Sequence, residues 1–386
     1  MRLRAVSRIF NKPMETRVVK LDPNKPDLGK IKEAAAIVDG GGIVAFPTET
    51  VYGIACRVRT ESLTRLSKVK GRDAEKHYTL HIGRTNDVEK YVPTIGIKAG
   101  KLIKRAWPGP LTLVFELGTE AINKQRNSLK ADVFENLYKD NSIGIRCPDN
   151  SIALALLQET RNPVVAPSAN ITGERPAVNA EEVLAQLTGQ IDLLLDAGPC
   201  KYKENSTVVK IGKKGLEVLR EGAYPRAELE EMSQVRFLFI CTGNTCRSPM
   251  AEGIFRKYLA EKLGCSVDWL DEMGYKVDSA GVIDRVGFFP TAEAIAACAA
   301  RWIDISAHES KMLSEQLVKE NDFIFAMCRT HREHVISLSP EAVNKCVLLA
   351  ENEDIADPIG QPQEIYNNCA GLIEKAVRKR IAELVI

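Results

Sequence analysis

The sequence has no hydrophobic run long enough to cross a membrane. None of the apolar stretches among its 386 residues approaches the roughly 18 residues that a spanning helix requires. Residues 1–10 carry basic side chains but no continuous apolar segment, so the N-terminus lacks the pattern of a secretory signal. We therefore expect a cytoplasmic protein without a membrane partner.

Several short motifs are also absent. The ten cysteines are scattered and include no Cys-x2-Cys pair, which argues against a zinc site or a disulfide framework and agrees with a reducing compartment. Neither a Gly-x4-Gly-Lys-Ser/Thr loop nor a Gly-x-Gly-x-x-Gly segment occurs, so Walker-type and Rossmann phosphate cradles are excluded. We expect no protein metal site and no tightly bound cofactor.

Net charge is small overall but uneven along the chain. The formal charge of +2 divides into +7 for residues 1–233 and −5 for residues 234–386. A chain of this length exceeds one ordinary core, so we expect two domains. The basic first part favours an anionic ligand such as a nucleotide, or RNA. Aromatic residues make up 6% of the chain, and the first part lacks the interleaved stacking residues of an RNA-binding module.

The clearest chemical motif is a Cys-x5-Arg segment at the start of the second part. An apolar run at residues 235–240 predicts a buried strand, and Pro249 suits the first turn of a following helix. The loop between them would point backbone N–H groups inward beside a helix N-terminus, which suits a phosphate dianion. Cys241 would then be a thiolate nucleophile of lowered pKa, and Arg247 would bind two phosphate oxygens.

A general acid is available downstream in Asp357-Pro358, where Asp357 can protonate a leaving group. Together with Cys-Thr-Gly-Asn-Thr-Cys-Arg-Ser and with Asp278-Ser-Ala-Gly281 and Asp304-Ile-Ser-Ala-His308, this pair resembles the low-molecular-weight protein phosphatases from about residue 235 to the end. The resemblance implies a doubly wound parallel-sheet domain, a cysteinyl-phosphate intermediate and a phosphoprotein substrate. It also implies that Ser248 steadies the thiolate and that Asn244 braces the loop.

Two residues bear on the phosphatase substrate. Thr245 stands where tyrosine-specific members usually have an aliphatic residue, and the branch that resembles this sequence there dephosphorylates protein arginine. Ile359 stands where tyrosine-specific members tend to have an aromatic residue. Both features predict a preference for phosphoarginine over phosphotyrosine. Cys246, beside the nucleophile, is a candidate redox partner that would form a reversible disulfide with Cys241.

In the first part, many polar residues follow apolar runs. They are Thr50, Lys70, Arg72, Arg146, Ser168, Asn170, Ser206 and Arg220. Because the ends of strands in one sheet can gather in one cleft, the pattern predicts an anion- or nucleotide-binding α/β cleft. Residues 120–140 are polar and poorly patterned, and we interpret them as an insertion.

Six ordered motifs of this part resemble the Sua5/YrdC family over about residues 25–230. They are Pro47-Thr-Glu-Thr-Val-Tyr-Gly53, Lys70-Gly-Arg72, Trp107-Pro-Gly-Pro-Leu-Thr112, Ile145-Arg-Cys-Pro148, Ala166-Pro-Ser-Ala-Asn170 and Arg220-Glu-Gly222. The resemblance implies an open, twisted α/β sheet with a large basic cavity. It further implies that L-threonine, bicarbonate and ATP, carried with Mg²⁺, form L-threonylcarbamoyladenylate and pyrophosphate for the machinery that makes N6-threonylcarbamoyladenosine in tRNA.

The resemblance also implies roles for individual residues. The expected L-threonine contacts are Thr50, His81, Arg146, Ala166 and Ser206. The expected ATP contacts are Lys70, Arg72, Lys76, Ser142, Ser168, Asn170, Pro176 and Arg220. The family's usual Lys-x-Arg-Pro-x-x-Asn/Lys-Pro-Leu segment is altered here to Lys70-Gly-Arg-Asp-Ala-Glu-Lys76-His-Tyr78, which keeps its charges.

These observations predict a bifunctional enzyme with two domains. We place an N-terminal extension at residues 1–24, the synthase domain at 25–222, a linker at 223–234 and the phosphatase domain at 235–386. The alternative hypothesis is that the first part is a non-catalytic module binding double-stranded RNA, fused to a protein tyrosine phosphatase. An RNA contact is compatible with the first hypothesis too, because the cavity is expected to be basic.

Overall fold

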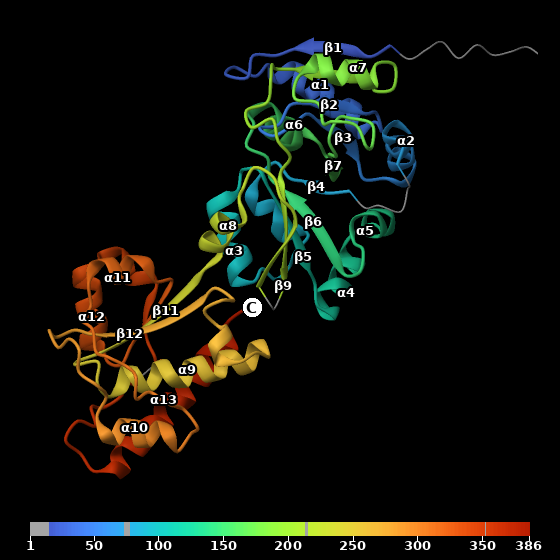
Figure 1. Ribbon diagram of the computed structural model, residues 1–386. Coiled ribbons are helices and arrows are strands. Elements are labelled where there is room, and N and C mark those ends of the chain that lie inside the picture. Colours follow the sequence, from blue (N-terminus) through green and yellow to red (C-terminus); the bar gives the residue numbers. More distant parts are fainter. Residues whose placement is uncertain (1–14, 73–77, 213–214, 352) are drawn as a thin grey trace, which may run out of the picture. The chain divides into compact units, whose positions relative to one another are not determined.

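The computed structural model describes residues 15–72, 78–212, 215–351 and 353–386 (Figure 1). The chain divides into two compact units, and the main boundary lies between Leu229 and Glu230. We call them the N-terminal unit and the C-terminal unit and describe each by itself. Among the described residues, no helix has the length and apolar character that crossing a membrane requires.

The N-terminal unit is built on a ten-stranded mixed sheet in the order β1-β8-β2-β3-β7-β4-β6-β5-β9-β10. Its strands are β1 (Arg17–Lys20), β2 (Val44–Phe46), β3 (Gly53–Arg57), β4 (Leu80–His81), β5 (Leu111–Glu116), β6 (Ser142–Arg146), β7 (Val164–Val165), β8 (Leu193–Asp196), β9 (Thr207–Gly212) and β10 (Gly215–Arg220). The pairs β1–β8, β2–β8, β4–β6 and β5–β9 are parallel. The central strands are short and lie between long connections, so residues distant in sequence meet at their ends.

Helices cover this sheet. They are α1 (Leu28–Asp39), α2 (Thr60–Lys70), η1 (Thr85–Lys90), α3 (Ile97–Ala106), α4 (Thr119–Ser128), α5 (Ala131–Leu137), α6 (Ser151–Glu159) and α7 (Ala180–Leu187). Helix α1 begins at the N-cap Asp27, whose carboxylate accepts from two backbone N–H groups, and its apolar stripe packs with α6 against the sheet. Ile31, Phe46 and Leu156 are fully buried in that layer.

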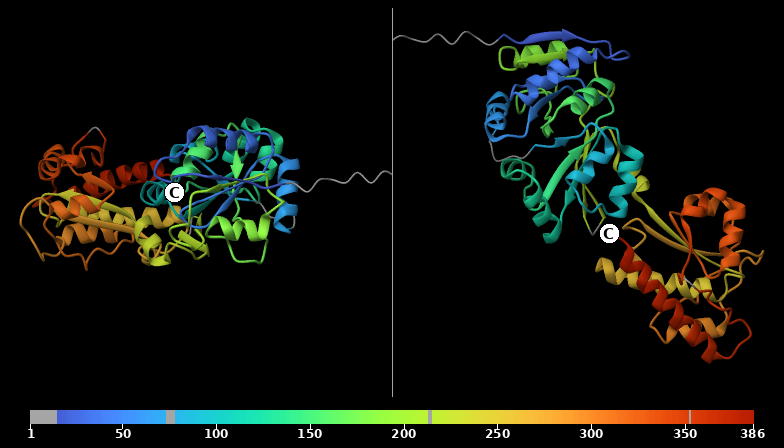
Figure 2. Two further views of the ribbon diagram at one scale, coloured as in Figure 1. Left: turned by 90° about the horizontal axis from the view of Figure 1, so that it is seen from above. Right: turned by 180° about the vertical axis from the view of Figure 1, so that it is seen from behind.

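The C-terminal unit is a four-stranded parallel sheet in the order β12-β11-β13-β14. Its elements are β11 (Val235–Cys241), α9 (Arg247–Leu263), η2 (Val267–Trp269), β12 (Tyr275–Gly281), α10 (Ala292–Ala299), α11 (Glu315–Glu320), β13 (Phe323–Ala326), α12 (Arg329–Leu338), η3 (Pro340–Asn344), β14 (Cys346–Leu348) and α13 (Gln363–Glu383). Helices α9 and α13 lie side by side in both views of Figure 2.

Strand β11 belongs to two buried layers at once. Phe237 and Phe239 point to the layer formed with α9, α10 and α13, whereas Leu238 and Ile240 point to the layer formed with α11 and α12. This alternation follows from the period of two along a strand, and helices on both faces make the sheet doubly wound. The predicted fold class, an open α/β sheet followed by a doubly wound parallel sheet, is confirmed.

The structure adds three details to the sequence-based boundaries. Strand β1 lies within the segment that we assigned to the N-terminal extension, and it pairs with β8. The presumed insertion contains the helices α4 and α5, and the presumed linker contains α8 (Arg226–Ser233). Helix α9 begins at Arg247, two residues before Pro249.

Candidate active sites

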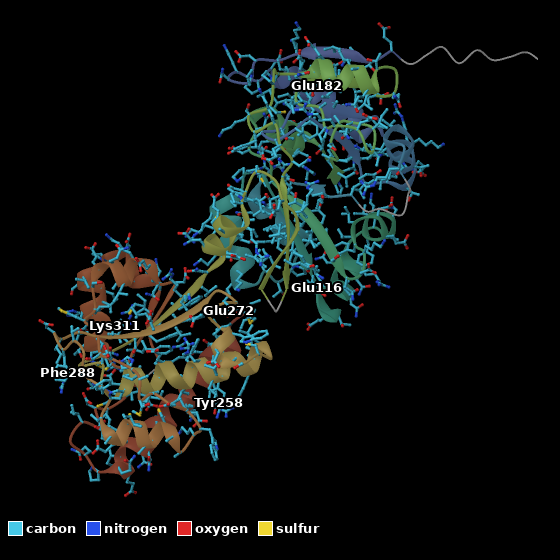
Figure 3. The ribbon with its side chains drawn as sticks, in the orientation of Figure 1. Glu116, Glu182, Tyr258, Glu272, Phe288 and Lys311 are labelled. Atoms are coloured by element: carbon cyan, nitrogen blue, oxygen red, sulfur yellow. The ribbon has the colours of Figure 1, made fainter. Side chains whose placement is uncertain are left out.

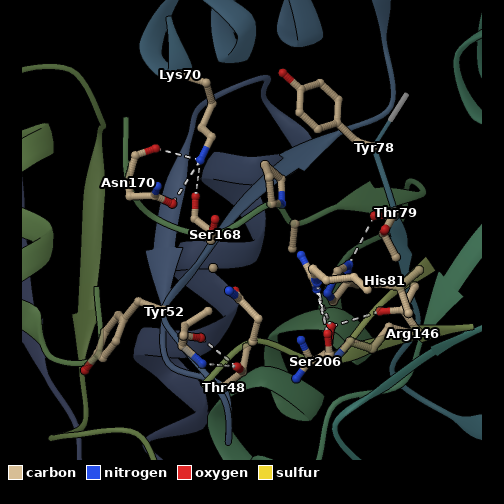
Figure 4. Close-up of a pocket in the computed structure, with 18 of the residues that line it drawn as sticks. Thr48, Tyr52, Lys70, Tyr78, Thr79, His81, Arg146, Ser168, Asn170 and Ser206 are labelled. Carbon is tan, nitrogen blue, oxygen red and sulfur yellow. Dashed lines mark hydrogen bonds between the residues drawn. The ribbon is translucent and has the colours of Figure 1, made fainter. Parts of the chain in front are cut away.

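A basic cavity of about 360 Å³ opens in the N-terminal unit (Figure 4). Nine of the residues expected to bind threonine or nucleotide line it: Lys70, Arg72, His81, Arg146, Ala166, Ser168, Asn170, Ser206 and Arg220. The sheet brings them together because β4 and β6 are parallel neighbours, with His81 opposite Arg146. The predicted cleft at the strand ends is therefore present in the fold.

Lys70 lies at the end of α2 and holds one wall of this cavity. Its Nζ donates to the carbonyl oxygens of Ser168 and Asn170 at 2.6 Å each, and to Asn170 Oδ1 at 3.2 Å. Burial, reinforced by the neighbouring Arg72, lowers the pKa of the Lys70 ammonium to about 8. Since all three N–H bonds are used within the protein, Lys70 supplies positive charge and shapes the wall.

Arg146 forms a buried ion pair that the sequence did not reveal. Its Nη2 donates to Glu49 Oε1 at 2.6 Å and to Thr50 Oγ1 at 2.7 Å, and Glu49 Oε2 also accepts from the backbone N–H of Asp149. The Thr48 hydroxyl donates to the Val51 carbonyl, so the Thr50 hydroxyl donates to Thr48 Oγ1. Thr50 is thus a buried support for Arg146, and it is absent from the cavity lining.

Two buried guanidinium groups in the cavity each keep an unused donor. The Nε atoms of Arg72 and Arg146 are buried and have no hydrogen-bond partner among the described residues. The guanidinium of Arg72 lies 4.8 Å from the centre of the Tyr78 ring, which holds it in place. An unpaired buried N–H is costly, so these groups are suited to an anionic ligand.

His81 is neutral in this cavity. Burial, followed by the charge of Arg146, lowers its pKa to about 3. Its Nδ1 lies 3.1 Å from the Thr79 carbonyl, which can only accept, so Nδ1 carries the proton and Nε2 is an acceptor.

Arg220 and Ser206 belong to a short hydrogen-bond chain in the lining of the cavity. Arg220 Nη2 donates to the Ser206 carbonyl at 2.7 Å and to Ser206 Oγ at 3.0 Å, and Ser206 Oγ lies 3.1 Å from Thr112 Oγ1. Burial, followed by the charge of Arg146, lowers the pKa of Arg220. Thr112 and Tyr78 line the cavity, and the sequence gave neither of them a role.

Three expected ATP contacts are not placed in the cavity. Ser142 and Pro176 are absent from its lining, and the Ser142 hydroxyl donates to the Lys139 carbonyl at 2.8 Å. Lys76 lies outside the described residues.

The second site is the loop between β11 and α9 in the C-terminal unit. Cys241 Sγ lies 2.9 Å from Ser248 Oγ and accepts from the backbone N–H of Asn244 at 3.2 Å. Asn244 has a left-handed backbone with φ of 53°, which asparagine tolerates better than most residues. Its side chain donates to Ser248 and Ser279 and accepts from the Lys311 N–H, so it braces the loop on three sides. Lys311, which is labelled in Figure 3, in turn pairs with Asp278 at 2.5 Å.

Arg247 is buried under this loop. Its Nη1 donates to the Ile355 carbonyl at 3.0 Å, and its Nη2 donates to Thr242 Oγ1 at 3.0 Å and to the Asp357 carboxylate. Its Nε is buried and has no hydrogen-bond partner among the described residues. The structure thus brings Arg247 together with Asp357 beside the loop of Cys241, the residues that we predicted as phosphate ligand, acid and nucleophile.

The pKa of Cys241 differs from our expectation. Burial raises the pKa of the thiol, and this effect exceeds the opposing effects of the hydrogen bonds from Ser248, the charge of Arg247 and the Asn244 N–H. The reason is that the sulfur is fully enclosed, so desolvation of the thiolate outweighs the donors around it.

The specificity residues differ in exposure. Thr245 is buried, and its carbonyl accepts from the Thr291 N–H at 3.0 Å. Ile359 is half exposed, and its N–H donates to Asp357 Oδ1. Cys246 is a free, buried thiol 3.5 Å from the Tyr366 hydroxyl, and Cys241 is free as well.

A half-buried acid, Glu252 of α9, was also missed. Glu252 accepts from Ser279 Oγ at 2.7 Å, which links it to Asn244, and His308 Nε2 lies 3.1 Å from the Asn244 carbonyl. Burial raises the pKa of Glu252 to about 7. Glu252 lies four residues after Ser248 on α9, but its partner Ser279 is 27 positions away, so the local sequence gave no pattern that would have identified it.

Comparisons with known proteins agree with this division. The family profile Sua5_yciO_yrdC, described as "Telomere recombination", matches residues 36–222, and the profile described as "Low molecular weight phosphotyrosine protein phosphatase" matches residues 236–385. A threonylcarbamoyl-AMP synthase of Pyrococcus abyssi is 32% identical over 234 residues, which are 59% of this chain and 65% of that protein. This chain therefore spans less than two thirds of that relative.

Two further relatives are matched over more of their length. A putative threonylcarbamoyl-AMP synthase of Mycobacterium tuberculosis (strain ATCC 25618 / H37Rv) is 31% identical over 212 residues, 55% of this chain and 92% of that protein. A solved low-molecular-weight protein tyrosine phosphatase from T. tengcongensis is 36% identical, covers 39% of this chain and 100% of its own, and has a TM-score of 0.35. The chain thus belongs to the Sua5/YciO/YrdC family through residues 36–222, and residues 236–385 match the low-molecular-weight phosphotyrosine protein phosphatase model.

Proposed function

We propose that the N-terminal unit is an L-threonylcarbamoyladenylate synthase. Its substrates are L-threonine, bicarbonate and ATP, and its adenylate product passes to the machinery that modifies tRNA. The observation that carries the proposal is the cavity itself, where Arg72 and Arg146 each keep a buried N–H without a partner in the described parts of the chain. Such donors suit the phosphates of ATP and the carboxylate of an amino acid.

The chemistry of this unit is mostly positioning. Threonine's amine attacks the carbon of bicarbonate and water leaves, which gives a carbamate. An oxygen of the carbamate then attacks the α-phosphorus of ATP while the bond to the β-phosphate breaks and pyrophosphate leaves. Arg72 and Arg220 would neutralise charge on the phosphates, with the Lys70 ammonium nearby. Mg²⁺ would arrive with ATP as part of the substrate, because the described residues include no group of three or more His, Cys, Asp and Glu side chains able to hold a metal.

Purified protein supplied with ATP, L-threonine and bicarbonate tests this proposal. We expect pyrophosphate release that requires both threonine and bicarbonate, together with the adenylate as a product. Hydrolysis of ATP at a rate indifferent to threonine would overturn the proposal, and RNA binding without pyrophosphate release would favour the non-catalytic alternative.

For the C-terminal unit we propose a cysteine-dependent phosphatase of phosphoprotein that prefers phosphoarginine to phosphotyrosine. Cys241 would attack phosphorus, Asp357 would protonate the leaving nitrogen or oxygen, and water would hydrolyse the cysteinyl phosphate. The preference is supported by the hydroxyl of Thr245 in the loop and by Ile359, which offers no ring for a phenol to stack on.

Peptides that carry either phospho-amino acid test the preference. We expect a higher kcat/KM for phosphoarginine, and Thr245→Ile should shift the ratio toward phosphotyrosine. A wild-type ratio that favours phosphotyrosine about tenfold, roughly 1.4 kcal/mol in transition-state binding, would contradict the preference.

A further inference from the structure

A chain of hydrogen bonds joins the loop between β11 and α9 to helix α12. Arg247 Nη2 donates to Thr242 Oγ1 at 3.0 Å, and Thr242 Oγ1 lies 3.0 Å from His331 Nε2. His331, in the first turn of α12, has its Nδ1 3.1 Å from Cys328 Sγ. The chain therefore joins the loop to a helix that follows a different strand.

The donors and acceptors of this chain have one consistent arrangement. A guanidinium can only donate, so Thr242 Oγ1 accepts from Arg247 and its own proton is available for His331 Nε2. That nitrogen is then an acceptor, and the ring proton lies on Nδ1, facing Cys328. A neutral ring is required, and burial, followed by the charge of Arg247, lowers the pKa of His331 to about 4. Asp357, Asp354 and His334 also face the ring and do not reverse this direction.

The three described hydrogen bonds to the Arg247 guanidinium are not equivalent. In two of them the guanidinium donates to acceptors of one short segment, residues 355–357. These acceptors are the Ile355 carbonyl and the Asp357 carboxylate. Asp357 has to leave the guanidinium when it protonates a leaving group, and Ile355 lies only two residues before it in the chain. The acceptor of the third bond, Thr242, lies in the loop and contacts His331 of α12. This bond does not involve residues 355–357, so it can hold Arg247 when Asp357 leaves.

We propose that His331 is a positioning residue for the phosphatase, acting through the Thr242 hydroxyl to hold Arg247 for the phosphate dianion. This role rests on the proposed phosphatase function and concerns no contact between His331 and substrate. Its consequence is that Thr242 and His331 form one functional pair, so removing either member should remove the same contribution.

A double-mutant cycle tests the pair. Thr242→Val keeps the shape and removes the hydroxyl, and His331→Leu removes the acceptor. With para-nitrophenyl phosphate as substrate, each single variant should lose about tenfold in kcat/KM, the worth of one hydrogen bond to a charged group. The double variant should lose no more than either single variant, because the pair acts as a unit. Thr242→Ser and His331→Gln, which keep the hydroxyl and an acceptor, should recover most of the activity.

Binding of inorganic phosphate separates positioning from a loss of structure. Calorimetric titration should show phosphate affinity falling in Thr242→Val and His331→Leu in the same proportion, with thermal unfolding cooperative in both. His334→Leu, an exposed histidine on the same helix, is the matched control and should leave phosphate affinity as in the wild type. Losses that multiply in the double variant, or unchanged phosphate affinity in both single variants, would overturn the proposal.

The titration also distinguishes this inference from the proposed function. If wild-type protein and Cys241→Ser were equally inactive on every phosphate ester and phosphoarginine peptide, the phosphatase proposal would fail. Phosphate binding by the Thr242 and His331 variants would still decide whether the pair positions Arg247.

Discussion

Three arginines in the two sites, Arg72, Arg146 and Arg247, share one property. Each is held by at least one neighbour, an aromatic ring or an acceptor, yet each retains a buried Nε–H without a described partner. Such a donor weakens the empty protein, because its hydration is lost without replacement. An oxyanion that accepts a hydrogen bond from this N–H replaces the lost hydration. The free energy that the unpaired donor costs the empty protein therefore contributes to the affinity for the oxyanion.

Arg72→Ala tests this at the synthase cavity. We expect the KM for ATP to rise about tenfold while the KM for threonine changes much less, because the variant removes a charged phosphate partner. Steady-state kinetics with each substrate varied in turn provides the measurement. Lys68→Ala removes an exposed charge from the same helix and should change neither constant, whereas equal changes for ATP and threonine would argue against the assignment.

Glu252 gives a pH-dependent stability of definite sign. Its pKa rises from 4.5 to about 7 in the folded protein, so between these values the folded state holds a proton that the unfolded state has released. Its contribution is complete below pH 4.5 and is lost as pH rises through about 7. Urea unfolding followed by circular dichroism should show wild-type stability falling relative to Glu252→Gln by up to about 3 kcal/mol over this window. A difference between the two proteins that is constant with pH would contradict the shift.

The sequence predicted those site residues that lie within contiguous motifs. Cys241, Ser248 and Arg247 share one loop and one helix end, so their meeting follows from local geometry. Glu49 was missed although it stands inside a recognised motif, because its role depends on Arg146, 97 positions away. His331 was missed for the same reason, since it approaches Thr242 across 89 positions.

At the scale of elements, α9 joins the phosphate loop to the core of the C-terminal unit. Phe255 on α9 is fully buried against the rings of Phe237 and Phe239, with centroids 4.7 and 5.3 Å away. These rings lie on the strand that ends at Cys241. The packing that stabilises the unit therefore also fixes the base of the loop.

Phe255→Ala should destabilise the C-terminal unit by about 3–5 kcal/mol, the usual cost of removing a buried phenyl ring from a close-packed core. Chemical denaturation of the full chain measures this change. Phe289→Ala removes an exposed ring of the same size and should change the free energy of unfolding by a few tenths of a kcal/mol, about the range of ordinary surface substitutions. Similar losses in the two variants would show that the layer around Phe255 is not close-packed.

Elements were predictable where apolar periodicity was strong. Strand β11 agrees with the apolar run at residues 235–240 that predicted it. Strand β1 has exposed or half-buried residues throughout and was missed, since its pairing with β8 depends on a partner 176 positions away. Helices α4 and α5 were missed because their sequences are mostly polar, and their few buried side chains, such as Ile122 and Val133, give a weak pattern.

At the scale of the molecule, each unit has its own buried layers. The layer around Ile31 and Phe46 is drawn from the N-terminal unit, and the layer around Leu238 and Ile324 is drawn from the C-terminal unit. Each family profile also ends within one unit. We expect the two activities to be separable.

Cys241→Ser tests this separation. The hydroxyl is too weak a nucleophile to replace the thiolate, so phosphatase activity should be abolished, while threonine-dependent pyrophosphate release should continue at the wild-type rate. Both assays on the same preparation provide the measurement. A large drop in adenylate formation would instead show that the units are coupled.

The ion pair between Arg247 and Asp357 has a further consequence for the resting phosphatase. In this pair the Asp357 carboxylate, which carries one negative charge, accepts a hydrogen bond from the Arg247 guanidinium that a phosphate would otherwise accept. A singly charged anion from solution has no electrostatic advantage over the Asp357 carboxylate, whereas a phosphate dianion carries twice its charge. We therefore expect the site to select by valence: singly charged anions should leave the pair closed, and a dianion should displace Asp357, which can then take up the proton that it delivers to a leaving group.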